Sequence, residues 1–260
     1  MTSPVTTLGQ YFTRQVTLGG ALARFFVRTL GAWRTLPREG RRVARRILLN
    51  QVWFTALQAI PLVLVLSSIL SFLVISQAVN ELGRLNATEF LGTLMVLAIV
   101  QELGPLLTAL VVVSRSGTAI AAELATNTVL GEVRALEGMG IDPIHYLVLP
   151  RFAAALVSVI GLLVVFDVVA IAAGLVAATA NGMAASRYFD VVIQSLSARD
   201  VWLTLGKGFV FGLIVGIVPS WHGLRVRRGP TEVPIAASRA VVVSILGIFV
   251  AAAVFVVFSR

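Results

Sequence analysis

Five long apolar stretches constrain what this chain can fold into more than any other feature. They cover residues 52–79, 90–113, 152–180, 201–221 and 234–258. Each is long enough to cross the hydrocarbon core of a bilayer, which takes about 20 helical residues. Backbone groups in lipid must be hydrogen-bonded internally, so an apolar stretch of this length predicts a helix. The sequence therefore predicts an all-α integral membrane protein with five transmembrane helices.

The composition agrees with this prediction. Of the 260 residues, 58% are hydrophobic and 13% are charged, whereas a soluble domain is about 45–50% apolar. The net charge of +9 comes from 20 arginines and one lysine, and the arginines lie beside the apolar stretches. That placement favours lipid headgroups as their partners, and we expect no nucleic-acid partner. The chain has no cysteine, which excludes disulfides, thiolate nucleophiles and cysteine metal ligands.

The arginines also predict an orientation in the membrane. If the amino terminus is cytoplasmic, 16 arginines fall on the cytoplasmic side and four fall outside. The four are Arg84, Arg187, Arg199 and Arg260. Because cytoplasmic connections carry an excess of Lys and Arg, the sequence predicts a cytoplasmic amino terminus and a carboxyl terminus on the outer side.

The first 50 residues are predicted to form a separate basic region, and residues 51–260 the transmembrane domain. On a helical wheel six residues fall on one side: Leu18, Leu22, Phe25, Phe26, Thr29 and Trp33. Arg24 and Arg28 fall opposite them. This amphipathic pattern predicts a cytoplasmic helix lying in the headgroup plane. The alternative is a disordered basic arm that only sets the orientation.

The sequence contains no common motif for hydrolysis or nucleotide binding. HExxH, GxSxG and GxxxxGK[ST] are all absent. His145 and His222 fall in or beside predicted cytoplasmic connections, and we interpret His145 as a loop residue rather than a ligand. The chain is therefore not expected to be an enzyme, or to bind a metal or cofactor itself, so any ATP must be hydrolysed by another protein.

Three ionisable residues fall inside the apolar stretches: Glu102, Asp167 and Lys207. Each costs at least about 2.5–3.5 kcal/mol at the centre of a lone helix, so each needs a partner, a cavity or water. We expect Lys207 to pair with Asp167 or Glu102 near a central cavity, or to form a purely structural ion pair. Pro105 follows Glu102 closely and is expected to bend its helix, either as a moving element or as a packing kink.

Glycines recur every four residues in the fourth stretch, at Gly208, Gly212 and Gly216. Small residues at this spacing let a second helix approach closely, because helix association in lipid depends on packing contacts. The pattern favours a partner helix in the same chain and leaves open a helix of another subunit.

A polar segment, EVRALEGMGIDPIHYLVLPR, lies between the second and third stretches at residues 132–151. Residues 118–139 predict one or two short helices, with Gly138 and Gly140 as terminating signals and Asp142 starting a turn. A mere connector would be rich in Gly and Ser, so we interpret the segment as a docking element. The alternative is a solvated loop.

The run from Gln101 to Arg151, which begins QELGPLLTALVVVSRSGTAIAAEL, resembles the MlaE/YrbE family. That family comprises the permease subunits of MCE-associated ATP-binding-cassette lipid transporters. The motifs LGKGFVFGLIVG and FDVVAIAAG are also similar to it, and the resemblance extends over about residues 50–260.

The resemblance implies a dimer of permease subunits, as a homodimer or a heterodimer, with two copies of a cytoplasmic ATPase that holds ATP and magnesium. It also implies an MCE-domain protein, expected as a hexamer, on the periplasmic side of a bacterial inner membrane, and a possible STAS-domain protein inside. The substrate would be a phospholipid or related lipid, moved between the inner membrane and the MCE protein to maintain outer-membrane lipid asymmetry.

Residue roles follow from the same resemblance. The polar segment would be a coupling helix in a coupling region of about residues 115–151. Its ATPase contacts would be Glu132, Val133, Arg134, Leu136, Glu137, Met139 and Asp142. The lipid pathway or its gate would include Glu102, Pro105, Asp167 and Lys207.

Some positions depart from the usual family pattern. Gln101 stands where R-E-L-G-P is common, and Arg134 where an acidic residue of E-I-D-A-L is frequent. Ala125 and Asn127 stand where Gly and Met are usual. These departures concern charge pairing with the ATPase rather than the fold.

Two other functions account for part of the sequence. A proton-coupled secondary transporter would use Glu102, Asp167 and Lys207 as its relay, but it leaves the ordered polar segment unexplained. A non-transporting scaffold would only anchor an ATPase or an MCE protein.

Overall fold

The structure, a computed structural model, describes residues 19–32, 47–85, 87–227 and 229–258. These ranges contain helices and short connections but no strand. Five helical stretches are long and apolar enough to span a membrane: Ile47–Arg84, Thr88–Val129, Ile144–Ala180, Ala198–Gly223 and Glu232–Phe258. The predicted all-α membrane fold with five spanning helices is therefore confirmed.

Changes in hydrogen-bond pattern divide the spans into elements. The first contains η1 (Trp53–Leu57) and α3 (Ile60–Arg84). The second contains η2 (Thr88–Phe90), α4 (Leu91–Leu94), η3 (Met95–Leu103), α5 (Gly104–Val112), η4 (Val113–Gly117) and α6 (Thr118–Val129). After α7 (Glu132–Gly138) come η5 (Ile144–Val148), α8 (Leu149–Ala180), α9 (Ala185–Ser195), α10 (Ala198–Gly223) and α11 (Glu232–Phe258). Each span extends beyond its predicted apolar stretch at one end or both.

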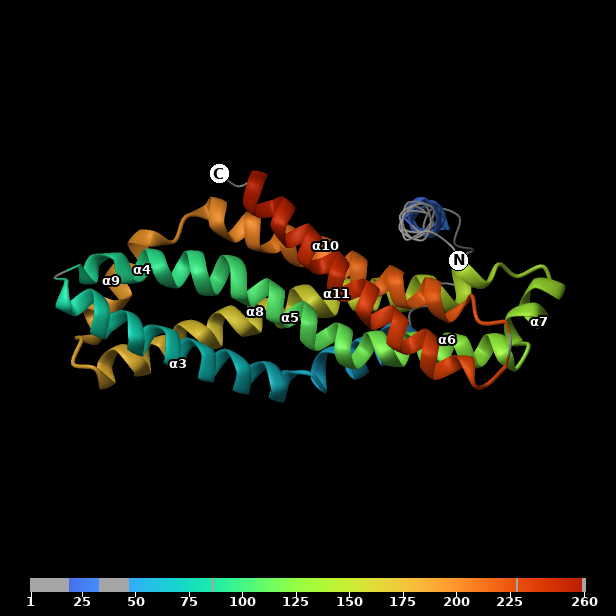
Figure 1. Cartoon of the computed structure of the whole chain (residues 1–260), viewed down its shortest axis with the longest axis horizontal. Helices are drawn as coiled ribbons and strands as arrows, with labels where there is room; N and C mark the ends of the chain where they lie inside the picture. The colour runs from blue at the N-terminus through green and yellow to red at the C-terminus, as the bar shows by residue number, and fades with distance from the viewer. Residues whose placement is uncertain (1–18, 33–46, 86, 228, 259–260) are drawn as a thin grey trace, which may run out of the picture.

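The spans form an elongated bundle with α7 at one end and α9 at the other, called here the α7 end and the α9 end (Figure 1). α8 is the central helix, since it packs along both α3 and α10. α10 in turn packs against α11 and α6. Ile75, Leu162, Phe166 and Phe211 belong to one continuous buried core between these helices.

The second span owes its irregularity to the sequence around Pro105. The nine residues Met95–Leu103 are π-helical, and the regular α5 begins at Gly104 with Pro105 in its first turn. Proline has no N–H and cannot donate to the carbonyl four residues earlier. A π-helical segment is a known way for a helix to accommodate such a break. The structure therefore shows a change in helical hydrogen bonding next to Pro105, and the predicted bend stays a prediction.

At the α9 end, α9 packs closely against α4 and α8. Gly92 on α4 lies against the backbone of Val191, where a Cβ would clash. The ring of Tyr188 is fully buried, and its hydroxyl donates to the Ile171 carbonyl at 3.0 Å. α9 has no counterpart among the predicted helices, because its 11 residues are too short to span a bilayer.

Residues 19–32 are helical and pack on the α7 end of the bundle. Leu22, Phe25 and Phe26 contact the buried cluster that includes Phe152 and Ile217. Arg24 and Arg28 are exposed, opposite this apolar side. The predicted division of the helix into apolar and basic sides is therefore present in these residues, while Leu18 and Trp33 lie outside the described residues.

Candidate functional site

One side of α7 packs against the bundle, and the other side exposes both polar and apolar side chains. The helix follows a turn at Gly131, whose φ of 82° lies in the left-handed region that favours glycine. Val133 and Leu136 point into the bundle and pack with the buried cluster of Ile120, Leu124 and Leu147.

The outward side of α7 and its two flanking turns mixes charge with exposed apolar surface. Glu132, Arg134 and Glu137 are all exposed. Beside them Leu130 is 69% exposed and Met139 66% exposed. The structure divides the seven predicted ATPase-contact residues into three groups. Val133 and Leu136 support the outward face, and Asp142 lies in the turn after α7. The other four form the face: Glu132, Arg134, Glu137 and Met139. We call Leu130, Glu132, Arg134, Glu137 and Met139 the α7 face.

The segment after α7 is shaped by short-range hydrogen bonds. α7 ends at Gly138, and Gly140 has a φ of 75°. The Asp142 carboxylate accepts a hydrogen bond from the Ile144 N–H at 2.9 Å, which starts η5. The signals predicted from the sequence at Gly138, Gly140 and Asp142 thus correspond to the turn that the structure contains.

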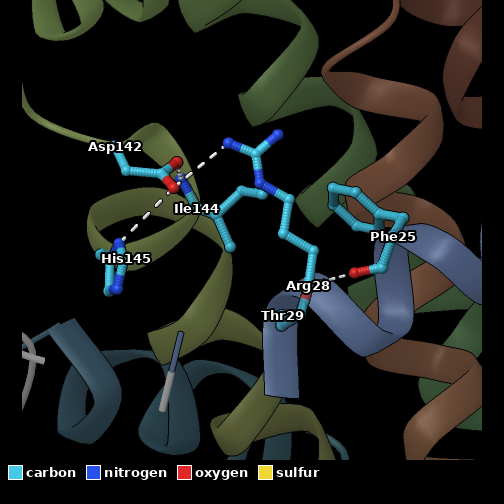
Figure 2. Close-up of polar contacts among 6 residues, drawn as sticks. All are labelled: Phe25, Arg28, Thr29, Asp142, Ile144 and His145. Carbon is cyan, nitrogen blue, oxygen red and sulfur yellow. Dashed lines mark hydrogen bonds and ion pairs between the residues drawn. The ribbon is translucent and has the colours of Figure 1, made fainter. Parts of the chain in front are cut away.

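Asp142 also connects this turn to the helix of residues 19–32 (Figure 2). Arg28 Nη2 lies 3.3 Å from Asp142 Oδ2, and His145 Nδ1 lies 3.7 Å from the same oxygen. The Arg28 side chain is 67% exposed and that of Asp142 31% exposed. An ion pair this exposed contributes only about 0–1 kcal/mol, so the apolar contacts of Leu22, Phe25 and Phe26 provide most of the attachment.

An ion pair between the buried Arg151 and the half-exposed Glu123 joins the base of the α7 face to the central helix. Arg151 Nη2 donates to Glu123 Oε1 at 2.6 Å, and Arg151 Nε donates to Glu123 Oε2 at 3.3 Å. Arg151 Nη1 also donates to the Leu147 carbonyl at 2.6 Å. Arg151 is only 5% exposed, so its planar guanidinium joins α6, η5 and α8 at one point. The sequence indicated Arg151 only as the inner edge of a span.

Lys207 and Glu102 meet inside the bundle. Lys207 Nζ lies 2.6 Å from Glu102 Oε1 and donates to the Gln101 carbonyl at 2.8 Å. In a regular α-helix this carbonyl would accept from the N–H of residue 105, but Pro105 has no N–H. The Lys207 ammonium group supplies a donor instead. Lys207 is 2% exposed, whereas the Glu102 side chain is 41% exposed. The pair therefore has one buried and one accessible member.

Gln101 extends this polar network to the start of α10. Its amide Nε2 donates to Asp200 Oδ1 at 2.7 Å. Asp200 Oδ2 accepts from the Ser197 N–H and hydroxyl in a capping box at the first turn of α10. The sequence marked Gln101 only as a departure from the family pattern. Its amide can donate to a carboxylate, which explains why it lies beside Asp200.

Asp167 is not brought to Lys207. Its Oδ1 atom is buried without a hydrogen-bond partner among the residues that the structure describes. A Cβ added at Gly104 would lie 2.7 Å from this oxygen, so the glycine of QELGP makes room for the carboxyl. In those same ranges no group of three His, Cys, Asp or Glu residues is placed to hold a metal ion.

The three predicted packing glycines all face α8 of the same chain. A Cβ at Gly208 would lie 2.7 Å from the Leu163 side chain. At Gly212 and Gly216 it would lie 3.0 Å and 3.1 Å from the Cα atoms of Leu156 and Phe152. The absence of side chains thus brings the backbones of α10 and α8 close together.

An apolar groove of about 550 Å³ lies between α3 and α8 and is lined by residues such as Phe72, Leu73, Val169 and Val176. A second groove, between α3 and α5, has a volume of about 360 Å³. Lys207 lines neither of these grooves, so the predicted central cavity at Lys207 corresponds to neither.

Comparison with known proteins places this architecture. Residues 48–258 match the family described as Permease MlaE. A probable ABC transporter permease protein of Rickettsia typhi is 32% identical over 197 residues, covering 75% of this chain and 76% of that protein. A probable ABC transporter permease protein of Synechocystis is 32% identical over 212 residues, covering 80% of each chain. The chloroplastic protein TRIGALACTOSYLDIACYLGLYCEROL 1 of Arabidopsis thaliana is 31% identical over 204 residues, which cover 78% of this chain and 58% of the plant protein.

Proposed function

The chain belongs to the Permease MlaE family and is a multi-pass ABC transporter permease, and from this premise we propose that it moves a phospholipid or related lipid. The α7 face is the observation that carries the mechanism. An ABC permease works with ATPase partners, and the α7 face offers them a rigid docking surface with both charge and apolar area. ATP and magnesium belong to the separate ATPase subunits in this proposal.

Three features support docking at the α7 face. Leu130 and Met139 expose apolar surface beside three charged residues, which is the mixture that protein interfaces use. The base beneath is held by Val133, Leu136 and the Arg151–Glu123 pair. A force applied to α7 would therefore move α6 and α8 rather than a loose loop.

A lipid is the substrate class that the molecule favours. The Arabidopsis relative bears the name of a diacylglycerol glycolipid. The two described grooves are both lined mainly by apolar side chains, as acyl chains require. In the proposed cycle, ATP binding draws two ATPase subunits together and moves α7 of two permease copies. The second span, irregular at η3 and Pro105, transmits that motion toward Glu102 and Lys207.

The remaining partners complete the proposal. An MCE-domain hexamer would receive or deliver lipid at the α9 end, and a STAS-domain protein would bind near the ATPases. Two permease copies, alike or different, would form the membrane part. We propose that the α7 end lies in the cytoplasm and the carboxyl terminus in the periplasm of a bacterial inner membrane, and the 16 arginines on one predicted side support this orientation.

Membership in a family of ABC permeases favours ATP-driven transport over the proton-coupled and scaffold alternatives. A proton relay through Asp167 also lacks a connection in the structure, because Lys207 contacts Glu102 and Gln101 instead.

Charge reversal on the α7 face tests the docking proposal. Glu132→Arg and Arg134→Glu are expected to reduce the amount of ATPase that copurifies with the chain in mild detergent, with membrane insertion unchanged. Asp190→Arg is the matched control, since Asp190 is exposed on α9 at the opposite end. Mass spectrometry of the same preparation identifies bound lipid and an MCE-domain protein. Normal ATPase recovery with both α7 variants would rule out this docking surface.

A further inference from the structure

The groove between α3 and α5 ends at an arginine. Its apolar lining includes Leu62, Leu66, Leu107 and Leu110. Arg115, on η4, also lines it. The groove between α3 and α8 has no charged residue in its lining, so the two grooves differ in what they can hold at their ends.

The Arg115 guanidinium makes two contacts and has a buried nitrogen without a hydrogen-bond partner among the described residues. Arg115 Nη2 donates to Gln58 Oε1, and the guanidinium carbon lies 5.5 Å from the centre of the Phe54 ring. Arg115 Nη1 is buried and has no hydrogen-bond partner among the described residues. A buried donor without an acceptor is costly, and a guanidinium has donors for two oxygens of one anion. The geometry therefore lacks an acceptor at this point.

The surroundings of Arg115 are those of the boundary between hydrocarbon and headgroups. It follows the apolar residues 90–113 of the second span. Across from it, on η1, Trp53 is 62% exposed and Phe54 42% exposed. Exposed aromatic residues beside an arginine are typical of this level of a membrane protein. An anion at this depth is most simply the headgroup of a lipid whose acyl chain extends toward the bilayer centre.

We propose that this groove binds a membrane lipid through its phosphate: Arg115 contacts the phosphate oxygens, and the leucines of α3 and α5 hold one acyl chain. Phosphate matches the guanidinium better than an uncharged sugar headgroup does, because both of its oxygens accept from the fork of donors. This lipid site would serve the proposed transport function, and the inference rests on that function only in giving the bound lipid a role in transport. Binding to the isolated chain is a separate property from ATP-driven transport.

The test measures lipid retained by the full-length chain in native mass spectrometry after purification and exchange into detergent with a defined lipid. Phosphatidylglycerol is the probe, diacylglycerol is the phosphate-free lipid, and inorganic phosphate is the lipid-free anion. Arg115→Gln is expected to lower phosphatidylglycerol binding about tenfold, as for the loss of a charge-assisted hydrogen bond. Leu107→Trp, which fills the groove, is expected to lower it as well.

Two matched controls separate this site from general effects. Arg239→Gln removes the same charge from an exposed position on α11, which packs against η4. Leu246→Trp adds the same bulk at a position of α11 that is 58% exposed and lines neither groove. Both controls are expected to bind phosphatidylglycerol as the unaltered chain does.

Other results would overturn the proposal. Equal retention by Arg115→Gln would show that Arg115 is only an interfacial anchor. If diacylglycerol binds as strongly as phosphatidylglycerol, the phosphate does not contribute to binding at this groove. If inorganic phosphate binds at Arg115 while the chain retains its lipid, then Arg115 binds a free anion and not the lipid phosphate. If Arg115→Gln lowers the yield of folded protein, Arg115→Lys supplies the comparison. Lysine keeps the charge but lacks the planar set of guanidinium donors, so we expect intermediate binding of phosphatidylglycerol. ATPase recovery is expected to be normal in all these variants, which distinguishes failure here from failure of α7 docking.

Discussion

Lys207 is the residue whose environment is most demanding. Its ammonium group is almost fully buried and has two acceptors, the Glu102 carboxylate and the Gln101 carbonyl. The sequence predicted that a lysine in a span needs a partner, and it left Glu102 and Asp167 as alternatives. The choice depends on which faces of three helices meet, and no local pattern in one sequence specifies that.

Replacing Lys207 tests this arrangement. Lys207→Met leaves the Glu102 carboxylate and the Gln101 carbonyl without their shared donor. We expect the free energy of unfolding in detergent to fall by about 1–3 kcal/mol, below the value for a fully buried pair because Glu102 is partly accessible. The double variant Lys207→Met/Glu102→Gln is expected to recover part of the loss, as measured in a double-mutant cycle. Additive effects of the two changes, with transport unaltered, would contradict a coupled pair.

Arg151 allows a comparison between a buried and an exposed arginine. Arg151→Lys keeps the charge but removes the bidentate contact with Glu123 and the bond to the Leu147 carbonyl. We expect a loss of about 1–3 kcal/mol in thermal or denaturant unfolding. Arg84→Lys is the control, because the Arg84–Glu81 pair is exposed on both sides and changes there are worth less than about 1 kcal/mol. Similar losses at the two positions would show that burial does not strengthen the Arg151 contact.

At the scale of elements, the five spans were predictable and most of their ends were not: only the ends at Ala180 and Phe258 match the predicted ones. Apolar length identifies a span because lipid forces the backbone into a helix. The second span nevertheless continues as α6 to Val129, where packing on α10 and α11 supports it. The π-helical segments and α9 also escaped prediction: Pro105 predicted a bend rather than a change in hydrogen bonding, and the 11 residues of α9 are too short to span a bilayer. The end of α7 at Gly138 was predictable because glycine acts locally.

The contact between α10 and α8 yields a prediction about elements. Gly212→Ala places a methyl group 2.9 Å from Leu156 Cδ1 and 3.0 Å from Leu156 Cα. Because one neighbour is backbone, the helices must separate, and we expect a loss of about 1–3 kcal/mol in unfolding free energy. Gly161→Ala is the matched control, since nothing lies within 4 Å of its added Cβ. That control is expected to be neutral or stabilising by about 0.5–1 kcal/mol. Tolerance of alanine at Gly212 would contradict close backbone packing.

At the scale of the whole molecule, the two ends of the bundle differ in kind. The α7 end carries the amphipathic α7 face, the ion pair of the buried Arg151 with Glu123, and the packed helix of residues 19–32. The α9 end carries a short helix packed tightly at Gly92 and Tyr188. Between them lies the polar network from Asp200 through Gln101 to Lys207 and Glu102. In the proposed mechanism, motion at α7 would pass along the packed second span to a charged pair with an accessible carboxylate.

The orientation of the whole molecule can be tested directly because the chain has no cysteine. Leu130→Cys places a thiol at the α7 end at a position that is 69% exposed, and Asp190→Cys places one on exposed α9. With the α7 end in the cytoplasm, a membrane-impermeant maleimide applied to intact spheroplasts is expected to label Asp190→Cys. It is expected to label Leu130→Cys only after permeabilisation. Coexpression of the ATPase should then protect Leu130→Cys and leave Asp190→Cys reactive, because docking covers one end alone. Labelling of Leu130→Cys in intact spheroplasts would show that the α7 end faces outward. The proposed orientation, and the proposed cytoplasmic side of ATP hydrolysis, would then be wrong.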